Sequence, residues 1–392
     1  MSIAKFAIHP SEGASEGRKA AMGGLPAAGA VVYVGCRTTA ERGGRGTGLS
    51  TWRIDAAGVW QQQDLVELTN PSFLTIEPAG RRLYAVHGDG SSASAFALRP
   101  DGRPELLGTV GCGGSNPVHL CVLDARTLAV ANYASGSVAF LDIADDGSLG
   151  EVRDLLELPG EPGPRAEQDG SHPHQVQLSR DRTRLYVPDK GLDTIFEIAV
   201  DQSHPRLIGA TPARPGSGPR HLVEHPRLPL AYVVDELACT VTTYWTACPG
   251  WCRGGDGSQH PDETACLVPL QTAATVPPDT HLSSGTPTTA AAIILSPGAR
   301  FLYVSNRGQD SVARFKVDIR TGRIDPAGWT RSGGRYPRFM ILDPSQTRLL
   351  VANERSDSIV PMTVDHTTGD LIAVGPPIST GSPVCIAFPP HR

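Results

Sequence analysis

The chain has 392 residues, a net charge of -5 and 19% charged residues, and its like charges form no long block. This balance excludes an extended basic surface for nucleic acid or an anionic membrane. The sequence also has no run of about 18 or more apolar residues, and its first residues lack the continuous apolar segment of a secretory signal. We therefore expect a soluble, cytoplasmic protein without nucleic-acid or membrane partners; the sequence does not indicate its oligomeric state.

Residues 1–29 are rich in Gly, Ala and Ser and precede any strand pattern, so we expect a flexible N-terminal arm there. From residue 30 to 392, short β-branched segments alternate with turns rich in Gly and Pro. The eight cysteines are scattered along a chain that is long enough to bury a core without disulfides. The pattern predicts one all-β unit over 30–392.

One strand pattern, which reads roughly L-Y-V-x-N, recurs seven times. The copies are VVYVGCR (31–37), RLYAVHG (82–88), LAVANY (128–133), RLYVPDK (184–190), LAYVVDE (230–236), FLYVSNR (301–307) and LLVANE (349–354). Most copies follow one another at steps of roughly 40–50 residues, which is the period of a four-stranded propeller blade. The repeats therefore predict a seven-bladed β-propeller.

Each copy is paired with an apolar strand that opens on a Pro dipeptide. These strands begin at Pro71, Pro117, Pro173, Pro219, Thr289 (where the Pro is lost), Pro337 and Pro383. The first L-Y-V strand has no Pro-led strand before it, and the last Pro-led strand has no L-Y-V strand after it. We expect these two strands to pair, because the pairing completes a blade and leaves the ring without a free edge.

The longest step contains an insertion within 246–288, including CPGWCRGGDGSQHPDETAC. Long loops on a propeller lie on one of its faces, frequently over the site. Cys248, Cys252, His260 and Cys266 could in principle bind zinc, but their spacing matches no standard zinc knuckle. We predict no metal site and no cofactor.

Residues at one repeat position should form a ring around the central channel. One residue after the leading Pro, the ring reads Ser72, Val118, His174, Arg220, Ala290, Arg338 and Val384. The next ring reads Phe73, His119, Gln175, His221, Ala291, Phe339 and Cys385. After the polar end of the L-Y-V strand, it reads Arg37, Gly88, Tyr133, Lys190, Glu236, Arg307 and Glu354. Cations, histidines and carboxylates converge there, which favours a polar site for a small anion.

Several of these residues have an equally ordinary structural explanation. An Arg at a strand end is often simply solvated or paired with a carboxylate. His119 and His221 share one repeat position beside a Pro dipeptide, which favours a shared structural role, and Glu354 has no evident partner. We retain Arg338, His119, Lys190 and Asn306 as candidate substrate-binding residues.

Four stretches resemble one known family. They are SHPHQVQLSRDRTRLYVPDKG, GPRHLVEHPRLPLAYVVDEL, LSPGARFLYVSNRGQDSV and GGRYPRFMILDPSQTRLLVANERSDSI. The resemblance is to the lactonase family of seven-bladed propellers, with its propeller-type 6-phosphogluconolactonases and 3-carboxy-cis,cis-muconate cyclases, and it extends from about residue 30 to the end outside the insertion. It implies His174, Arg220, Glu236 and Arg307 as catalytic residues. One departure is Ala292, where many members carry an acidic residue.

For a lactonase, we expect Glu236 or His174 to activate water and Arg220 and Arg307 to bind the anionic substrate and the oxyanion. The sequence does not show which of these two residues is the base. The substrate expected for hydrolysis is a small anionic lactone of the 6-phosphogluconolactone type. The resemblance leaves open a lactone-forming cycloisomerase acting on a muconate-type diacid. A propeller that only binds a partner is the third alternative.

Overall fold

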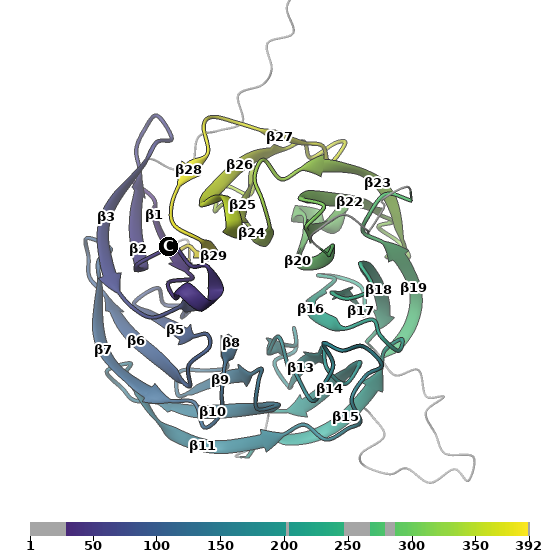
Figure 1. Ribbon diagram of the computed structural model, residues 1–392, viewed down its shortest axis with the longest axis horizontal. Helices are drawn as coiled ribbons and strands as arrows, with labels where there is room; N and C mark the ends of the chain where they lie inside the picture. The colour runs from purple at the N-terminus through teal and green to yellow at the C-terminus, as the bar shows by residue number, and fades with distance from the viewer. Residues whose placement is uncertain (1–28, 201–203, 247–266, 279–286, 391–392) are drawn as a thin grey trace, which may run out of the picture.

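The computed structural model describes residues 29–200, 204–246, 267–278 and 287–390. Its strands form seven antiparallel sheets arranged as blades around a central channel (Figure 1). This confirms the predicted all-β, seven-bladed propeller. The expected arm at 1–29 and the Cys-containing loop within 246–288 lie largely outside the described residues. Within the described part, no helix is long and apolar enough to cross a membrane.

Each blade has its Pro-led strand innermost and its L-Y-V strand second. The innermost strands, from blade 1 to blade 7, are β29 (Pro383–Ala387), β4 (Pro71–Ile76), β8 (Pro117–Val122), β12 (Gln177–Leu178), β16 (Pro219–Glu224), β20 (Thr289–Leu295) and β24 (Pro337–Leu342). The second strands are β1 (Val31–Cys36), β5 (Arg82–His87), β9 (Thr127–Asn132), β13 (Arg184–Asp189), β17 (Leu230–Asp235), β21 (Phe301–Arg307) and β25 (Arg348–Asn353).

The remaining strands lie farther from the channel. The third strands are β2 (Gly48–Ile54), β6 (Ser92–Leu98), β10 (Ser137–Ile143), β14 (Thr194–Ala199), β18 (Thr240–Trp245), β22 (Ser311–Val317) and β26 (Ser358–Val364). The outer strands are β3 (Trp60–Glu67), β7 (Pro104–Gly111), β11 (Leu149–Glu157), β15 (Arg206–Pro212), β19 (Val268–Ala274) and β23 (Ile324–Arg331), with β27 (Leu371–Ala373) and β28 (Ile378–Ser379) in blade 7. Three short 3₁₀ helices are η1 (Ala40–Arg42), η2 (Pro297–Ala299) and η3 (Glu354–Ser356).

The two ends of the propeller close the ring. β29 pairs antiparallel with β1, and Tyr33 lies opposite Ala387 in this register. Blade 1 is therefore built from the last strand of the chain and the first three, as the incomplete repeats predicted. Figure 1 shows the yellow C-terminal strand beside the purple N-terminal strands.

A bulge follows the leading residue of each innermost strand. In blade 5, Pro219 pairs with Asp235 and His221 pairs with Val234, so that Arg220 is the extra residue. The same shift occurs in blades 1, 2, 3 and 7. A β-bulge turns one side chain away from the regular alternation of the strand. The residue after the leading Pro is thereby placed at the channel in one blade after another.

Two innermost strands differ from the prediction. In blade 4, Pro173 forms only an isolated bridge with Asp189, and regular pairing begins at Gln177. In blade 6, Ala290 rather than Thr289 pairs with Asn306, which occupies the polar strand-end position. Without a Pro to mark the start, the predicted ring positions in this blade were wrong by one residue.

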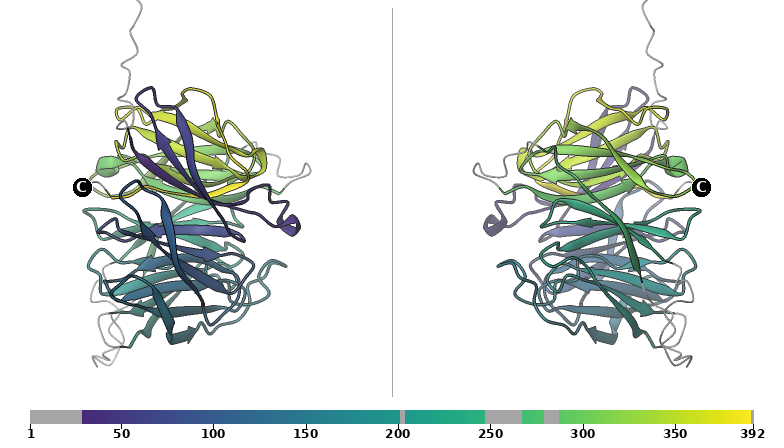
Figure 2. Two further views of the ribbon diagram at one scale, coloured as in Figure 1. Left: turned by 90° about the vertical axis from the view of Figure 1, so that its left-hand side faces the viewer. Right: turned by 90° about the vertical axis from the view of Figure 1, so that its right-hand side faces the viewer.

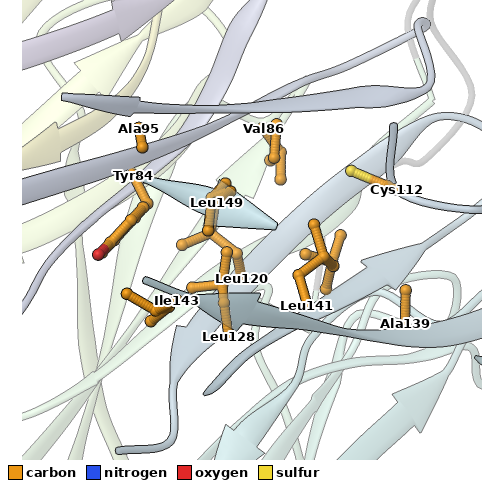
Figure 3. Packing of buried hydrophobic residues seen from close by; sticks show 12 residues of the cluster. Tyr84, Val86, Ala95, Cys112, Leu120, Leu128, Ala139, Leu141, Ile143 and Leu149 are labelled. Atoms are coloured by element: carbon orange, nitrogen blue, oxygen red, sulfur yellow. The ribbon is translucent and has the colours of Figure 1, made fainter. Parts of the chain in front are cut away.

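Hydrophobic cores lie between neighbouring blades. Figure 3 shows one of them, where Tyr84 and Val86 of blade 2 pack with Leu120 and Leu141 of blade 3. The tyrosine of the L-Y-V pattern adds a hydrogen bond from its blade to the next. The Tyr33, Tyr84, Tyr232 and Tyr303 hydroxyls donate to the carbonyl oxygens of Gly102, Gly147, Gly322 and Gly369, at 2.6, 3.2, 2.8 and 2.9 Å. The pattern therefore links consecutive blades as well as forming strands.

Replacing Tyr303→Phe should lower the free energy of unfolding by about 1–2 kcal/mol, because it removes the donor to a carbonyl in a buried hydrogen bond. The matched control is Tyr186→Phe, at the same position of blade 4, whose hydroxyl has no hydrogen bond within the described residues. We expect the control to change stability by less than about 0.5 kcal/mol. Urea unfolding of both variants tests this; equal losses would contradict the role of the tyrosine hydroxyl.

Candidate functional site

A polar cavity of about 220 Å³ occupies one mouth of the channel. Its lining is Arg37, Arg42, Asn116, Val118, Tyr133, His174, Lys190, Glu236, Arg307, Tyr336 and Arg338. A second cavity of about 20 Å³ shares Arg37, Val118, His174 and Arg338 with it and also contacts Arg220 and His221. The 3₁₀ helix η1 (purple) projects from the ring at this mouth (Figures 1 and 2).

Two repeat positions supply most of the lining. Lys190, Glu236 and Arg307 stand at or just after the end of a second strand, whereas His174 and Arg338 occupy the bulge after a leading Pro. The polar residue at the end of each second strand stays behind this surface and bonds within the scaffold. For example, the Asn132 side chain donates to the Cys112 carbonyl at 3.0 Å. The scaffold thus holds two adjacent rings of side chains at the mouth.

Glu236 is the centre of an ion-pair cluster. Its Oε2 lies 2.9 Å from Arg220 Nε and 3.0 Å from Arg307 Nη2. Its Oε1 lies 3.9 Å from Lys190 Nζ. All four residues are buried, at 9% exposure or less. One carboxylate therefore contacts three cations contributed by blades 4, 5 and 6.

The bulged strand β20 anchors both arginines. Arg220 Nη1 donates to the Ala291 carbonyl at 2.8 Å, and Arg307 Nη2 donates to the Ala290 carbonyl at 3.0 Å. Blade 6 thus contributes backbone oxygens at the place where other blades contribute a side chain. Ala292 packs into the hydrophobic core between blades 6 and 7 and is not part of the cavity lining.

The cluster keeps Glu236 ionised. Burial alone would raise the pKa of this carboxyl, but Arg307, Arg220 and Lys190 outweigh burial and lower the pKa to about 2. Burial and the neighbouring Arg307 lower the pKa of Arg220. Both oxygens of this carboxylate face cations, whereas a proton acceptor needs an oxygen that is free to contact water. Its geometry suits it to hold the two arginines in place.

His174 has a different environment. It lines both cavities, and its Nδ1 is buried without a hydrogen-bond partner among the described residues. Burial and the nearby Arg220 lower its pKa well below the ordinary value of 6.5, so that the imidazole is neutral at pH 7. The rings of Tyr133 and His221 contact it edge-on, with centroids at 5.6 and 5.2 Å. A neutral imidazole beside cations can accept a proton from a bound water.

A second group of cations lies at the same mouth, on blades 7 and 1. Arg37 Nη1 lies 3.3 Å from Asp89 Oδ2, and Arg42 Nε donates to the same oxygen at 2.9 Å. Arg338 Nη1 lies 3.8 Å from Glu354 Oε2, so that Glu354, which had no evident partner in the sequence, has one in the fold. Asp89 and Glu354 are not part of the cavity lining, whereas the three arginines are.

Two predicted binding residues lie elsewhere. Asn306 accepts a hydrogen bond from the Thr275 hydroxyl and donates to the Thr275 carbonyl, each at 2.7 Å, so it links blades 5 and 6 behind the mouth. His119 lies deeper in the channel, where its ring contacts Phe73 at 4.0 Å and its Nδ1 accepts from the Val176 amide at 3.4 Å. Neither residue lines the cavity of about 220 Å³, and we do not retain them. Lys190 and Arg338 do line it.

The prediction missed six lining residues, namely Asn116, Val118 and four charged or aromatic residues. Arg37 and Tyr133 stood in the predicted rings but were not selected, and Arg42 belongs to η1, outside the repeat. Tyr336 has a left-handed φ of 66° just before Pro337, and its ring lies 5.3 Å from the Arg307 guanidinium. The residue before the leading Pro also has a positive φ in blades 1, 2, 3 and 5, at Ser382, Asn70, Asn116 and Gly218, so this conformation belongs to the repeated bulge. In the sequence, only the motif GGRYPR pointed to the neighbourhood of Tyr336.

The arrangement can bind an anion. Five cationic side chains line the larger cavity with one carboxylate, Glu236. Guanidinium groups bind carboxylates and phosphates through paired hydrogen bonds. Among the described residues, no group of three or more His, Cys, Asp or Glu side chains is placed to hold a metal ion. Cys248, Cys252, His260 and Cys266 lie outside the described residues.

Comparisons with known proteins agree with this architecture. The 6-phosphogluconolactonase of Bacillus subtilis is 26% identical over 363 residues, which cover 91% of this chain and 98% of that protein. The 6-phosphogluconolactonase of Formosa agariphila is 28% identical over 316 residues, 76% of this chain and 83% of that protein. The periplasmic gluconolactonase of Pseudomonas aeruginosa superposes with a TM-score of 0.79 at 28% identity, covering 92% of this chain and 98% of that one.

The comparison with protein families covers nearly the whole propeller. The family described as "Lactonase, 7-bladed beta-propeller" matches residues 31–388, which includes all seven blades and every residue of the cavity lining. The chain belongs to the lactonase family of seven-bladed β-propellers.

Proposed function

We propose that this protein hydrolyses a small anionic lactone of the sugar-acid type, such as 6-phosphogluconolactone, without a metal ion. The observation that supports this most is the neutral His174 beside a carboxylate–arginine cluster in a cation-lined cavity. Relatives named 6-phosphogluconolactonase align with 76% and 91% of this chain. The proposed partner is the lactone alone, and the cytoplasmic location stays a prediction.

In the proposed reaction, His174 takes a proton from water as the water oxygen attacks the lactone carbonyl carbon. Nη2 of Arg307 contacts the Glu236 carboxylate and donates to the Ala290 carbonyl. Nη1 of Arg307 has no partner within the described residues, so it can bind the developing oxyanion. The ring C–O bond then breaks. The leaving oxygen takes the proton back from His174, and the product is the open hydroxy acid.

Glu236 has a positioning role in this mechanism. Its ion pairs hold Arg220 and Arg307 at fixed places, and these pairs are incompatible with a carboxylate that takes up a proton near pH 7. Of the two candidate bases, we therefore propose His174. Without Glu236, two buried guanidinium groups would face each other without a counter-charge.

The proposal is tested by offering the purified full chain three substrates. We expect rapid acid release from 6-phosphogluconolactone above its spontaneous hydrolysis, slower release from neutral gluconolactone, and no change in the diene absorbance of a carboxymuconate. Loss of diene absorbance without lactone hydrolysis would replace the proposal with cycloisomerisation. Turnover of none of the three would favour a binding scaffold.

The pH dependence follows from His174. An imidazole must be neutral to accept a proton, and the pKa of His174 in the free enzyme is well below 6.5, so kcat/KM should stay level from pH 8 through pH 6.5 and fall only at lower pH. His174→Asn should lower kcat about 100-fold or more, and the exposed His204→Asn should not change it. A wild-type profile that breaks near pH 6.5, or a His174→Asn variant with full turnover, would contradict His174 as the base.

A further inference from the structure

The cations on blades 7 and 1 have no role in the chemistry described so far. Arg37, Arg42 and Arg338 line the cavity, but none of them contacts Glu236. In a ring of seven blades, the boundary between blades 7 and 1 faces blade 4 across the channel (Figure 1). His174 and Lys190 of blade 4 are thus opposite this second cationic group, whereas Arg307 of blade 6 stands beside blade 7.

The second group is under-neutralised. Asp89 is shared between Arg37 and Arg42, so this trio has a net charge of +1. Arg37 is 3% exposed, and its Nε is buried without a hydrogen-bond partner among the described residues. Arg37 also lies in the same two cavities as Arg338, and the like charge of Arg338 adds to burial in lowering the pKa of Arg37. An anion between these guanidinium groups would supply the missing counter-charge.

Arg42 completes this group from a separate element. It is the last residue of η1, which projects at the mouth between β1 and β2 (Figure 2). Its side chain is about half exposed, and Asp89 holds it toward Arg37 through two hydrogen bonds. A guanidinium group held in this way can bind an oxyanion with little further loss of side-chain freedom.

We infer that Arg37, Arg42 and Arg338 form a subsite for an anionic substituent of the substrate, remote from the reacting carbonyl, and that Arg42 determines specificity for charged over neutral lactones. The inference rests on the proposed function and adds an orientation to it. The carbonyl faces His174 and Arg307, while a phosphate or carboxylate at the other end of the molecule binds Arg37, Arg42 and Arg338 on blades 7 and 1. A substrate that has the lactone carbonyl but no anionic group would contact only His174 and Arg307.

The test compares Arg42→Ala with wild type on 6-phosphogluconolactone and neutral gluconolactone. The ratio of kcat/KM for the charged lactone to that for the neutral lactone should fall about tenfold, which is the loss expected for one charge-assisted hydrogen bond. The matched control is Arg126→Ala, an exposed arginine that also pairs with an aspartate and should leave the ratio unchanged. An unchanged ratio in Arg42→Ala would overturn the inference.

A second measurement separates this inference from the proposed function. Calorimetric titration with inorganic phosphate reports on the subsite without turnover. We expect wild type and Arg126→Ala to bind phosphate with equal affinity, and Arg42→Ala to bind it about tenfold more weakly. If neither lactone is hydrolysed, the proposed function fails, but this difference in phosphate affinity still supports the anion subsite. Equal phosphate affinity in all three proteins, or no binding to wild type, would overturn it.

Discussion

The contact of the Glu236 carboxylate with Arg220 and Arg307 is the interaction on which the rest of the site depends. A buried carboxylate is unfavourable alone, and so are two buried guanidinium groups near each other. Together they are stable as buried ion pairs. The Ala290 and Ala291 carbonyls of β20 accept one further hydrogen bond from each arginine, so that blades 5 and 6 are tied together at the mouth.

This cluster also determines the state of its neighbours. Its cations contribute to the low pKa of His174, which leaves a neutral imidazole beside several positive charges. The low pKa of Glu236 means that the carboxylate remains charged over the whole range in which the protein would work. The site therefore combines a fixed electrostatic frame with one proton acceptor. This division of roles is why we assign proton transfer to His174.

Much of this could be predicted because the fold is a repeat. Equivalent positions in different blades converge on one channel, so the ring that contains Arg37, Lys190, Glu236 and Arg307 could be assembled from spacing alone. The prediction failed where it departed from this logic. Asn306 stands one residue before the ring position of Arg307, and its amide bonds to Thr275 behind the mouth, as Asn132 bonds within the scaffold of blade 3.

The other features that the sequence did not predict each depend on the local structure of one segment. The register of blade 6 could not be read, because Ala290 replaces the Pro that marks the bulge elsewhere. Arg42 lies on η1, a connection outside the repeat, and only the folded chain brings it beside Asp89. The position of Tyr336 depends on a left-handed backbone conformation that propensity would not favour.

The central claim is that Glu236 acts through its arginines, and a double-mutant cycle tests it most directly. The cycle compares kcat/KM for 6-phosphogluconolactone in Glu236→Gln, Arg307→Ala and the double variant, with circular dichroism to verify folding. If Glu236 only positions the arginines, the double variant should be no worse than the poorer single variant, since the second change removes a partner already without function. Independent, multiplicative losses would contradict the account and return Glu236 to a direct role in proton transfer.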